Sequence, residues 1–157
     1  MHVSARADYA VRALVELAAS GGQPLKREQI ATAQHIPVTF LANILQQLRT
    51  AGLVTTHRGN DGGYLLTLRP ERITIADVIR AVDGPLANVR GDSPEAVKYD
   101  GSAEALCEVW IAVRASLRKV LEQVTLKDVA TNALPAVVHE LASEPNAWEP
   151  SKGYSSR

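Results

Sequence analysis

The sequence predicts a mainly α-helical fold that carries one small β-hairpin. Three observations lead to this prediction. Apolar residues recur at helical spacing over most of the 157 residues, a stretch rich in glycine and β-branched residues interrupts them between Leu53 and Leu68, and a long apolar stripe follows from Ser102 to Val124. Hydrophobic residues make up 46% of the chain, which is enough for one sizeable core.

The first helix is expected to begin after Ser4, a good N-cap residue, and to end near Ala19, where a serine and two glycines follow. One face of this helix is apolar and should be buried. That face carries Tyr9, Ala10, Ala13, Leu14, Leu17 and Ala18.

The segment from Lys26 to Leu68 predicts two short helices and then a two-stranded hairpin with the sequence Arg58-Gly59-Asn60-Asp61-Gly62-Gly63 at its tip. This order is that of a winged helix-turn-helix. Such a domain presents one helix to a major groove of DNA and a hydrogen-bonding loop to the neighbouring backbone or minor groove.

The second helix of this motif is expected to start near Pro37, because proline suits the first helical position. Spacings of three and four predict a buried stripe of Ile36, Phe40, Leu41, Ile44, Leu45 and Leu48. The opposite face carries amides, a hydroxyl and one charge, which is the chemistry of base reading, although an ordinary solvated face is the alternative. It consists of Val38, Thr39, Ala42, Asn43, Gln46, Gln47 and Arg49.

The hairpin is expected to follow Gly52, a glycine placed where a left-handed helix C-cap is needed. Its tip is rich in residues that accept positive φ and allow close approach of the backbone to a ligand, while His57 and Arg58 bring cationic groups. A solvated turn arginine is the alternative for Arg58. The candidate DNA-binding residues are therefore Lys26, Arg27, Val38, Thr39, Phe40, Ala42, Asn43, Gln46, Arg49, His57, Arg58 and Asn60.

A further short helix should begin at Thr74, which with Asp77 resembles a capping box, and should end at Gly84-Pro85. Residues 1–84 would then form the DNA-binding domain. The polar, turn-rich stretch 85–102 is expected to be a loop.

A long helix is expected from Ser102 to about Val124, or roughly 30 Å of continuous apolar stripe. Pairing with the same helix of a second chain would bury it, although an intramolecular core helix is the alternative. The interface candidates are Leu106, Trp110, Val113, Leu117, Val120, Leu121 and Val124. Residues 103–142 would hold the dimerisation and C-terminal helices, interrupted at Pro135, and 143–157 a flexible tail.

Composition limits the function. Net charge is zero, but residues 1–72 hold eight Lys/Arg against five Asp/Glu, and residues 73–157 hold nine against twelve. The positive half is the half with the winged motif, which supports DNA binding. No apolar run is long enough for a membrane, no signal peptide is evident and no motif of an enzyme occurs, so we expect a cytoplasmic protein that is not an enzyme and has no membrane partner.

The chain resembles the Rrf family of bacterial transcriptional regulators, which contains iron-sulfur-cluster regulators, nitric-oxide-sensing repressors and cysteine-metabolism repressors. The resemblance runs from about Ser4 to Val129. Its most specific parts are residues 8–14, Phe40-Leu41 with residues 48–54, Arg58-Gly59 through Gly62-Gly63-Tyr64, and residues 73–79. The resemblance implies a homodimer joined through the long helix, base contacts from Thr39, Phe40, Ala42 and Asn43, and entry of Arg58 into the minor groove.

Many members of that family hold an iron-sulfur cluster with three cysteines near the start of the long helix. This chain has one cysteine, Cys107, and by comparison with the family Glu104 stands at the position of the last cluster cysteine. One thiolate cannot hold a cluster, so no cofactor and no metal site are expected. Asp8 matches an acidic cluster ligand of some members and is expected instead to be a first-turn or salt-bridge residue.

The sequence leaves the regulatory signal open. A small molecule or a partner protein could contact the 85–101 loop and the long helix, as cysteine-free members of the family suggest. Oxidation of Cys107 could also be the regulatory signal. The alternative is that this lone cysteine, beside Leu106 and Trp110, is a small core residue. We expect a homodimeric repressor on a pseudo-palindromic operator. The alternative is a winged-helix dimer that makes protein contacts and has no DNA affinity.

Overall fold

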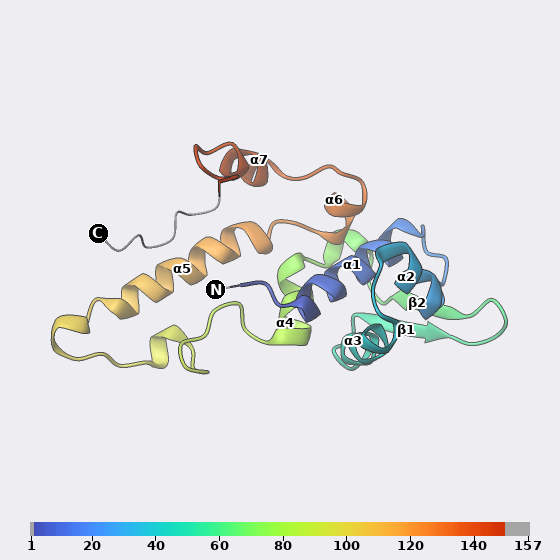
Figure 1. Ribbon diagram of the computed structural model, residues 1–157, viewed down its shortest axis with the longest axis horizontal. Helices are drawn as coiled ribbons and strands as arrows, with labels where there is room; N and C mark the ends of the chain where they lie inside the picture. Colours follow the sequence, from blue (N-terminus) through green and yellow to red (C-terminus); the bar gives the residue numbers. More distant parts are fainter. Residues whose placement is uncertain (1, 150–157) are drawn as a thin grey trace.

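The computed structural model describes residues 2–149 and is elongated, with a helical domain and its hairpin at one end and a long helix at the other (Figure 1). Seven α-helices and one antiparallel pair of strands occur in this part of the chain. Their bounds are α1 Ala5–Ala19, α2 Arg27–Gln34, α3 Val38–Thr50, β1 Val54–His57, β2 Gly63–Leu66, α4 Ile75–Asp83, α5 Leu106–Leu121, α6 Leu126–Ala130 and α7 Ala136–Ala142. Short 3-10 turns cover Pro70–Arg72, Pro94–Ala96 and Gly101–Ala103.

Helix α1 lies at the centre of the winged domain and packs against α2, α3, α4, α6 and β2. The Ser4 hydroxyl caps it by accepting a hydrogen bond of 2.9 Å from the Ala7 amide, as the sequence predicted. Its apolar face supplies five buried residues, and α2 to α4 and α6 supply most of the rest of the core. One contiguous core therefore closes this end of the molecule.

The turn between α2 and α3 reverses the chain through His35, whose φ of 52° is left-handed. Pro37 is the N-cap of α3, so the helix begins one residue later than expected. The core face of α3 consists of Leu41, Ile44, Leu45 and Leu48, as predicted.

The expectation that Phe40 is buried was wrong, because its side chain is 59% exposed. The apolar spacing is correct, and Leu41 in the same turn is fully buried, but the Phe40 side chain is not covered. The Phe40 ring makes an edge-to-face contact with Tyr9, at 6.5 Å between centroids. Periodicity gives the direction of a side chain and does not tell whether another element lies there.

The hairpin pairs Val54 with Leu66 and His57 with Gly63, and a bridge from Leu25 to Tyr64 adds to its second strand. Two glycines at the tip have no room for a side chain. A Cβ on Gly62 would lie 2.3 Å from the His57 carbonyl oxygen, and one on Gly63 would lie 2.5 Å from the Leu25 carbonyl oxygen. Glycine is thus required for the tight turn and for the close approach of the chain before α2. The glycine predicted to end α3, Gly52, has a φ of 78°.

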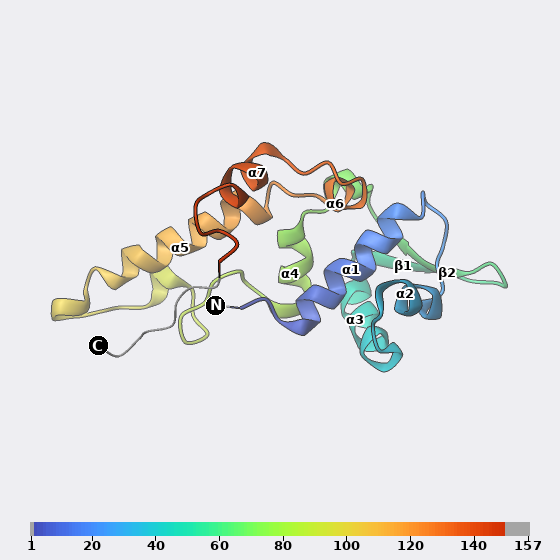
Figure 2. The same cartoon turned by 45° about the horizontal axis from the view of Figure 1, so that its top comes forward.

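Helix α4 begins at the predicted capping box, in which Thr74 and Asp77 bond to each other's backbone amides, and ends at Gly84. The segment 85–105 contains two 3-10 turns and runs beside α5 (Figures 1 and 2). The helix expected from Ser102 to Val124 is shorter at both ends, because Gly101–Ala103 forms a 3-10 turn and α5 ends at Leu121.

The chain after α5 is fastened to the winged domain. The Ile75 amide donates to the Val124 carbonyl oxygen and the Leu126 amide to the Ile73 carbonyl oxygen, each at 2.9 Å. Val124 is 6% exposed there, so it lies within the protomer and not on the long helix. This removes Val124 from the expected dimer interface.

Two short helices complete the described chain. Pro135 precedes α7 as its N-cap, which agrees with the expected interruption. Of the expected tail, residues 143–149 are described, and there the Trp148 indole Nε1 donates to the Ala142 carbonyl oxygen at 2.7 Å. Residues 150–157 lie outside the described part. Within the described residues, every helix is too short or too polar to cross a membrane.

Candidate nucleic-acid interface

The outward face of α3 carries side chains that can read bases. Thr39, Asn43 and Gln46 are exposed, Ala42 is half-buried and Val38 is 41% exposed. Amides can bond bidentately to adenine, and hydroxyl and methyl groups can contact other base edges. Arg49 is exposed near the end of the helix, where a guanidinium could reach a phosphate.

Sequence reasoning missed an aromatic and cationic cluster beside this face. The Arg12 guanidinium carbon lies 5.4 Å from the centroid of the Tyr9 ring, which in turn holds Phe40 edge-on. Arg12 also forms an ion pair of 3.1 Å with Asp8 one turn earlier. Asp8 is therefore a first-turn, salt-bridged residue, as expected. The heptapeptide from Asp8 to Leu14 was a signal of the family, but no pattern in it indicates a contact with α3.

The start of α2 contributes two cations. Lys26 is exposed, and its backbone amide donates to the Gln29 side-chain oxygen at 2.7 Å. Arg27 is half-buried and contacts Glu28 at 2.9 Å. Backbone hydrogen bonding and the Arg27 side chain lower the pKa of Glu28. Of the two cations, Lys26 is thus the better placed to meet a phosphate.

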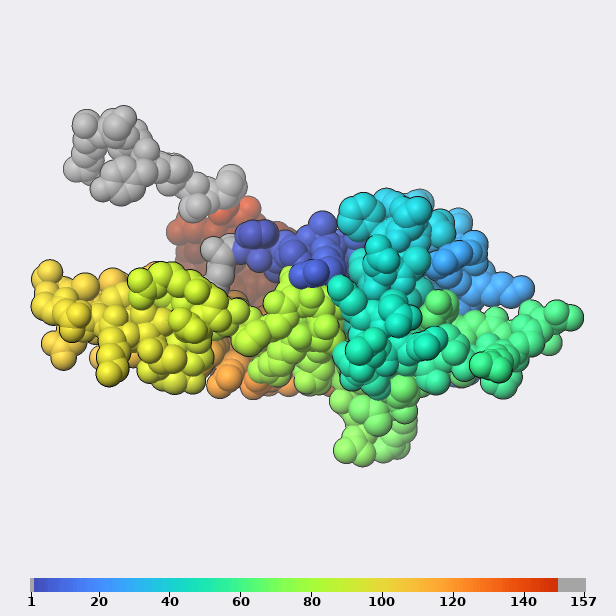
Figure 3. All heavy atoms as spheres, turned by 90° about the horizontal axis from the view of Figure 1, so that it is seen from below, coloured from blue at the N-terminus to red at the C-terminus, as the bar shows by residue number. Residues whose placement is uncertain are grey.

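The wing brings a second set of exposed groups. His57, Arg58 and Asn60 are all exposed, and in the described part of the chain no carboxylate lies within 4 Å of the Arg58 guanidinium. Seen from below in Figure 3, α3 in cyan faces the viewer and the hairpin projects beyond it. Helix and wing are thereby presented together, which is the arrangement that a winged domain uses on duplex DNA.

Helix α5 leaves its apolar face open. None of its residues is buried, and Val109 is 48% exposed. A shallow groove of about 710 Å³ runs along it. Its lining consists of Val3, Val109, Ala112, Val113, Ser116, Leu117, Val120 and Leu121.

The groove contains four of the predicted interface residues: Val113, Leu117, Val120 and Leu121. Two others lie outside it. Leu106 is 38% exposed near the start of α5, and Trp110 turns to the preceding loop, where its Nε1 donates to the Tyr99 hydroxyl at 3.0 Å.

Arg114 fastens the loop to α5 through an ion pair of 2.6 Å with Glu95. Backbone hydrogen bonding and this guanidinium lower the pKa of the Glu95 carboxyl group. Two separate contacts, the indole bond and the ion pair, thus hold the 85–105 segment against the helix.

Cys107 is half-buried, and its Sγ lies 3.6 Å from the Pro94 carbonyl oxygen. That contact suits a packing residue. Together with Cys107, Glu104 and Glu108 line a shallow depression at the start of α5. Among the described residues, His, Cys, Asp and Glu form no group of three that could hold a metal ion.

The chain is similar to known proteins in both sequence and fold. A family model, Rrf2, described as an iron-dependent transcriptional regulator, matches residues 3–132. The chain belongs to the Rrf2 family. A protein of Mycobacterium tuberculosis (strain ATCC 25618 / H37Rv) named as an HTH-type transcriptional regulator is 49% identical over the whole chain and 98% of its own length.

Two solved structures of Rrf2-type regulators show the same fold. CymR, titled the global cysteine regulator of B. subtilis, is 33% identical with a TM-score of 0.72, covering 84% of this chain and 98% of its own. IscR of T. potens is 29% identical with a TM-score of 0.69, covering 94% and 96%. The predicted winged-helix fold is confirmed. The Rrf2 protein described here is a DNA-binding transcriptional regulator and not an enzyme.

The family description names iron, so a member that holds an iron-sulfur cluster needs side chains that can bind one. Iron-sulfur clusters are held by several cysteine thiolates. The chain has a single cysteine, and Cys107 already contacts a backbone carbonyl group. Its acidic neighbours Glu104 and Glu108 are hard oxygen donors, and one cysteine with carboxylates does not supply the several thiolates that a cluster needs. The residues present in this Rrf2 protein do not fit a cluster.

Proposed function

We propose that the protein is a homodimeric repressor that binds a pseudo-palindromic operator in the cytoplasm, where bacterial DNA lies. The observation that carries the proposal is the joint exposure of the α3 outer face and the wing cations on a domain whose core is closed. Thr39, Asn43, Gln46 and Arg58 are exposed and can approach a duplex without unfolding the domain.

In this proposal α3 enters a major groove. Thr39 and Asn43 lie on its first turns and read base edges, and Gln46 lies next along the same face. Arg58 on the wing enters the adjacent minor groove, with His57 and Asn60 beside it. Lys26 and Arg49 contact phosphates and fix the register.

The dimer forms through the α5 groove. A helix of 16 residues without one buried side chain is not stabilised by its own protomer alone. The groove residues Val113, Leu117 and Val120 would face the same residues of the second copy, since a two-fold interface is self-complementary. Two α3 helices would then reach successive major grooves, about one duplex turn apart.

The regulator works without an iron-sulfur cluster in this proposal, because its donor set lacks the thiolates that a cluster needs. Protein purified without oxygen is expected to be colourless. A visible absorbance band that follows the iron content of the preparation would contradict the cluster-free proposal.

The test of DNA binding is fluorescence polarisation with the chain's own upstream DNA and with a scrambled duplex of equal length, over a series of salt concentrations. We expect tighter binding to the upstream DNA and an affinity that falls steeply with salt, since phosphate contacts release counterions. Equal binding to both duplexes, or none, would favour the alternative of a module for protein contacts.

Matched variants locate the contacts. Arg58→Ala should weaken binding to the upstream DNA by about tenfold, the effect of one lost groove contact. Arg90→Ala makes the same change in the 85–105 segment, outside the winged domain, and should leave affinity unchanged. Equal losses from both variants would show a general charge effect.

Repression is tested separately with a reporter fused to the upstream DNA. A dimer that occupies a promoter most simply blocks polymerase, so deletion of the regulator should raise reporter output. A fall in output on deletion would make the protein an activator.

A further inference from the structure

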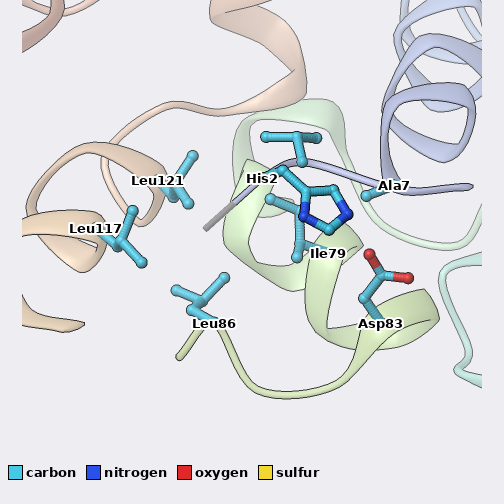
Figure 4. Close-up of a pocket in the computed structure, with 8 residues that line it drawn as sticks. His2, Ala7, Ile79, Asp83, Leu86, Leu117 and Leu121 are labelled. Carbon is cyan, nitrogen blue, oxygen red and sulfur yellow. The ribbon is translucent and has the colours of Figure 1, made fainter. Parts of the chain in front are cut away.

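A cavity of about 280 Å³ lies where the winged domain meets the C-terminal part of α5. Figure 4 shows its walls converging from four segments: the N-terminal residues before α1, the start of α1, the end of α4 with the residues after it, and α5. The lining is almost entirely apolar, with Ile79, Leu86, Leu117 and Leu121 among its walls. This volume lies just below the usual range for small-molecule sites.

The cavity has one polar end, formed by Asp83 with the His2 ring beside it (Figure 4). One Asp83 oxygen, Oδ2, accepts a hydrogen bond from the Ser4 hydroxyl. The other, Oδ1, accepts a hydrogen bond of 2.9 Å from Arg6 Nε and lies 2.8 Å from Arg6 Nη2 in an ion pair. A carboxylate offers about four acceptor positions, so acceptor capacity is left on Asp83. Its charge is already balanced by Arg6, which favours a neutral donor over a cation.

The cavity lies at the place where a guest could change the direction of α5. The end of α5 is fastened to α4 by the backbone bonds at Ile75 and Leu126 and by the Arg80–Glu122 ion pair. The last two turns of α5 face the cavity through Leu117 and Leu121, which also line the open groove. A molecule that fills the cavity beside the fastened C-terminal end of α5 would shift the apolar groove of α5 relative to the winged domain.

We propose that this cavity is an effector site for a small, neutral, mainly apolar molecule with one N–H or O–H group that donates to Asp83. About nine water volumes of roughly 30 Å³ fit in the space, so the molecule has about nine non-hydrogen atoms. Its binding changes the angle of α5 and thereby the spacing of the two α3 helices. This last step rests on the proposed dimeric function.

Indole is the probe, because it has nine non-hydrogen atoms and one N–H donor. Methyl NMR of the full-length protein should show the Leu86, Leu117 and Leu121 signals moving with a dissociation constant on the order of 1 mM. Benzofuran has the same size and no donor, and it should bind at least about fivefold more weakly. Equal affinity for the two probes would overturn the role of Asp83.

A filled cavity provides the control. Leu86→Trp should abolish the indole-dependent shifts, whereas Leu141→Trp makes the same change on α7, outside the cavity lining, and should preserve them. The site is overturned if indole moves none of these methyl signals up to about 5 mM, as would happen if the partner protomer fills the cavity. It is also overturned if Leu86→Trp still binds.

Regulation is read from the DNA affinity in the presence and absence of saturating indole. We expect a change of at least about fivefold in the parent protein and none in Leu86→Trp. Binding of indole with unchanged DNA affinity would overturn the regulatory step and leave the DNA-binding proposal intact. Loss of all DNA binding in the unliganded parent would instead count against the proposed function, whatever indole does.

Discussion

Helices α1 and α5 have almost the same length and the same apolar periodicity, yet they end in opposite environments. Helix α1 buries five residues, from Ala7 to Leu17, whereas α5 buries none. The difference lies in their neighbours. Four helices and a strand surround α1, while in the described part of the chain α5 packs mainly against a 3-10 turn, α4 and α7. An apolar stripe on a helix thus predicts that another surface covers it. It does not predict whether that surface belongs to the same chain or to a second one.

The two regions should also differ in what holds them together. The winged domain gains most of its stability from its own buried core, to which residues distant in the sequence contribute. The apolar face of α5 gains little until something covers its groove. Measurements that separate folding from association can therefore test the comparison directly.

The largest effect is expected for Leu14→Ala in the core of the winged domain. Leu14 is fully buried, so its truncation should lower the free energy of unfolding by about 3 kcal/mol. The matched change Leu106→Ala on α5, where the side chain is 38% exposed, should cost less than about 1 kcal/mol. Denaturant unfolding at low protein concentration gives both values. Equal losses would mean that α5 is already covered within one protomer.

Val120→Glu should separate the two protomers, because it places a charge in the apolar groove. Light scattering after gel filtration should show half the parent mass. Affinity for the upstream DNA should fall about 100-fold, or roughly 2.7 kcal/mol, through loss of the second half-site. Ala115→Glu adds the same charge on the exposed part of α5 outside the groove lining and should remain dimeric. A dimeric Val120→Glu protein would place the interface elsewhere.

Asp83→Asn tests the contact between the end of α4 and the start of α1, which lies where the winged domain meets α5. Burial alone would raise the pKa of Asp83, but the hydrogen bonds from Ser4 and Arg6 prevail and lower it. At pH 7 the substitution should cost about 1–2 kcal/mol of unfolding free energy. Because the pKa of Asp83 is lower in the folded protein, the ionised carboxylate stabilises the fold fully above the unfolded-state pKa of 3.8. This stabilisation is lost as the pH falls through the pKa of the folded state. The difference in thermal midpoint between parent and variant should therefore shrink below about pH 4. A constant difference down to pH 2 would contradict the ionic contact.

The smallest effect concerns the aromatic contact between α1 and α3. Tyr9→Leu removes the ring that holds Phe40 and should reduce the preference for upstream over scrambled DNA about fivefold, or roughly 1 kcal/mol. Tyr9→Phe keeps the ring and should retain the preference. A fall in both variants would assign the effect to the Tyr9 hydroxyl group and not to the aromatic contact.

Much of the winged domain could be predicted from the sequence because its signals are local. Ser4 and Thr74 cap helices through bonds to residues three positions away, and Gly52 and Gly84 end helices through backbone conformations that glycine accepts. The outer face of α3 followed from its period, and the exposed Thr39, Asn43 and Gln46 are where that period places them. Their contacts with DNA stay predictions.

The errors lie where distant segments meet. The exposure of Phe40, its contact with Tyr9 and the burial of Val124 all depend on how separate elements meet, which no local pattern contains. The predicted long helix extended through Val124 because its apolar spacing continues past Leu121, although the backbone there turns to pair with the segment before α4. Hydrogen bonding to the strand-like segment before α4 overrode the helical period.

By itself, the sequence determined the order of helices and hairpin, the exposed polar face of α3 and the absence of the thiolates that a cluster needs, because periodicity, capping and composition are properties of neighbouring residues. Only the tertiary structure decided which apolar faces are covered, that Asp83 fastens the start of α1 to the end of α4, and that a cavity separates the winged domain from α5. Packing depends on the volume and direction of segments far apart in the chain, and no local pattern records how well they fill the space between them.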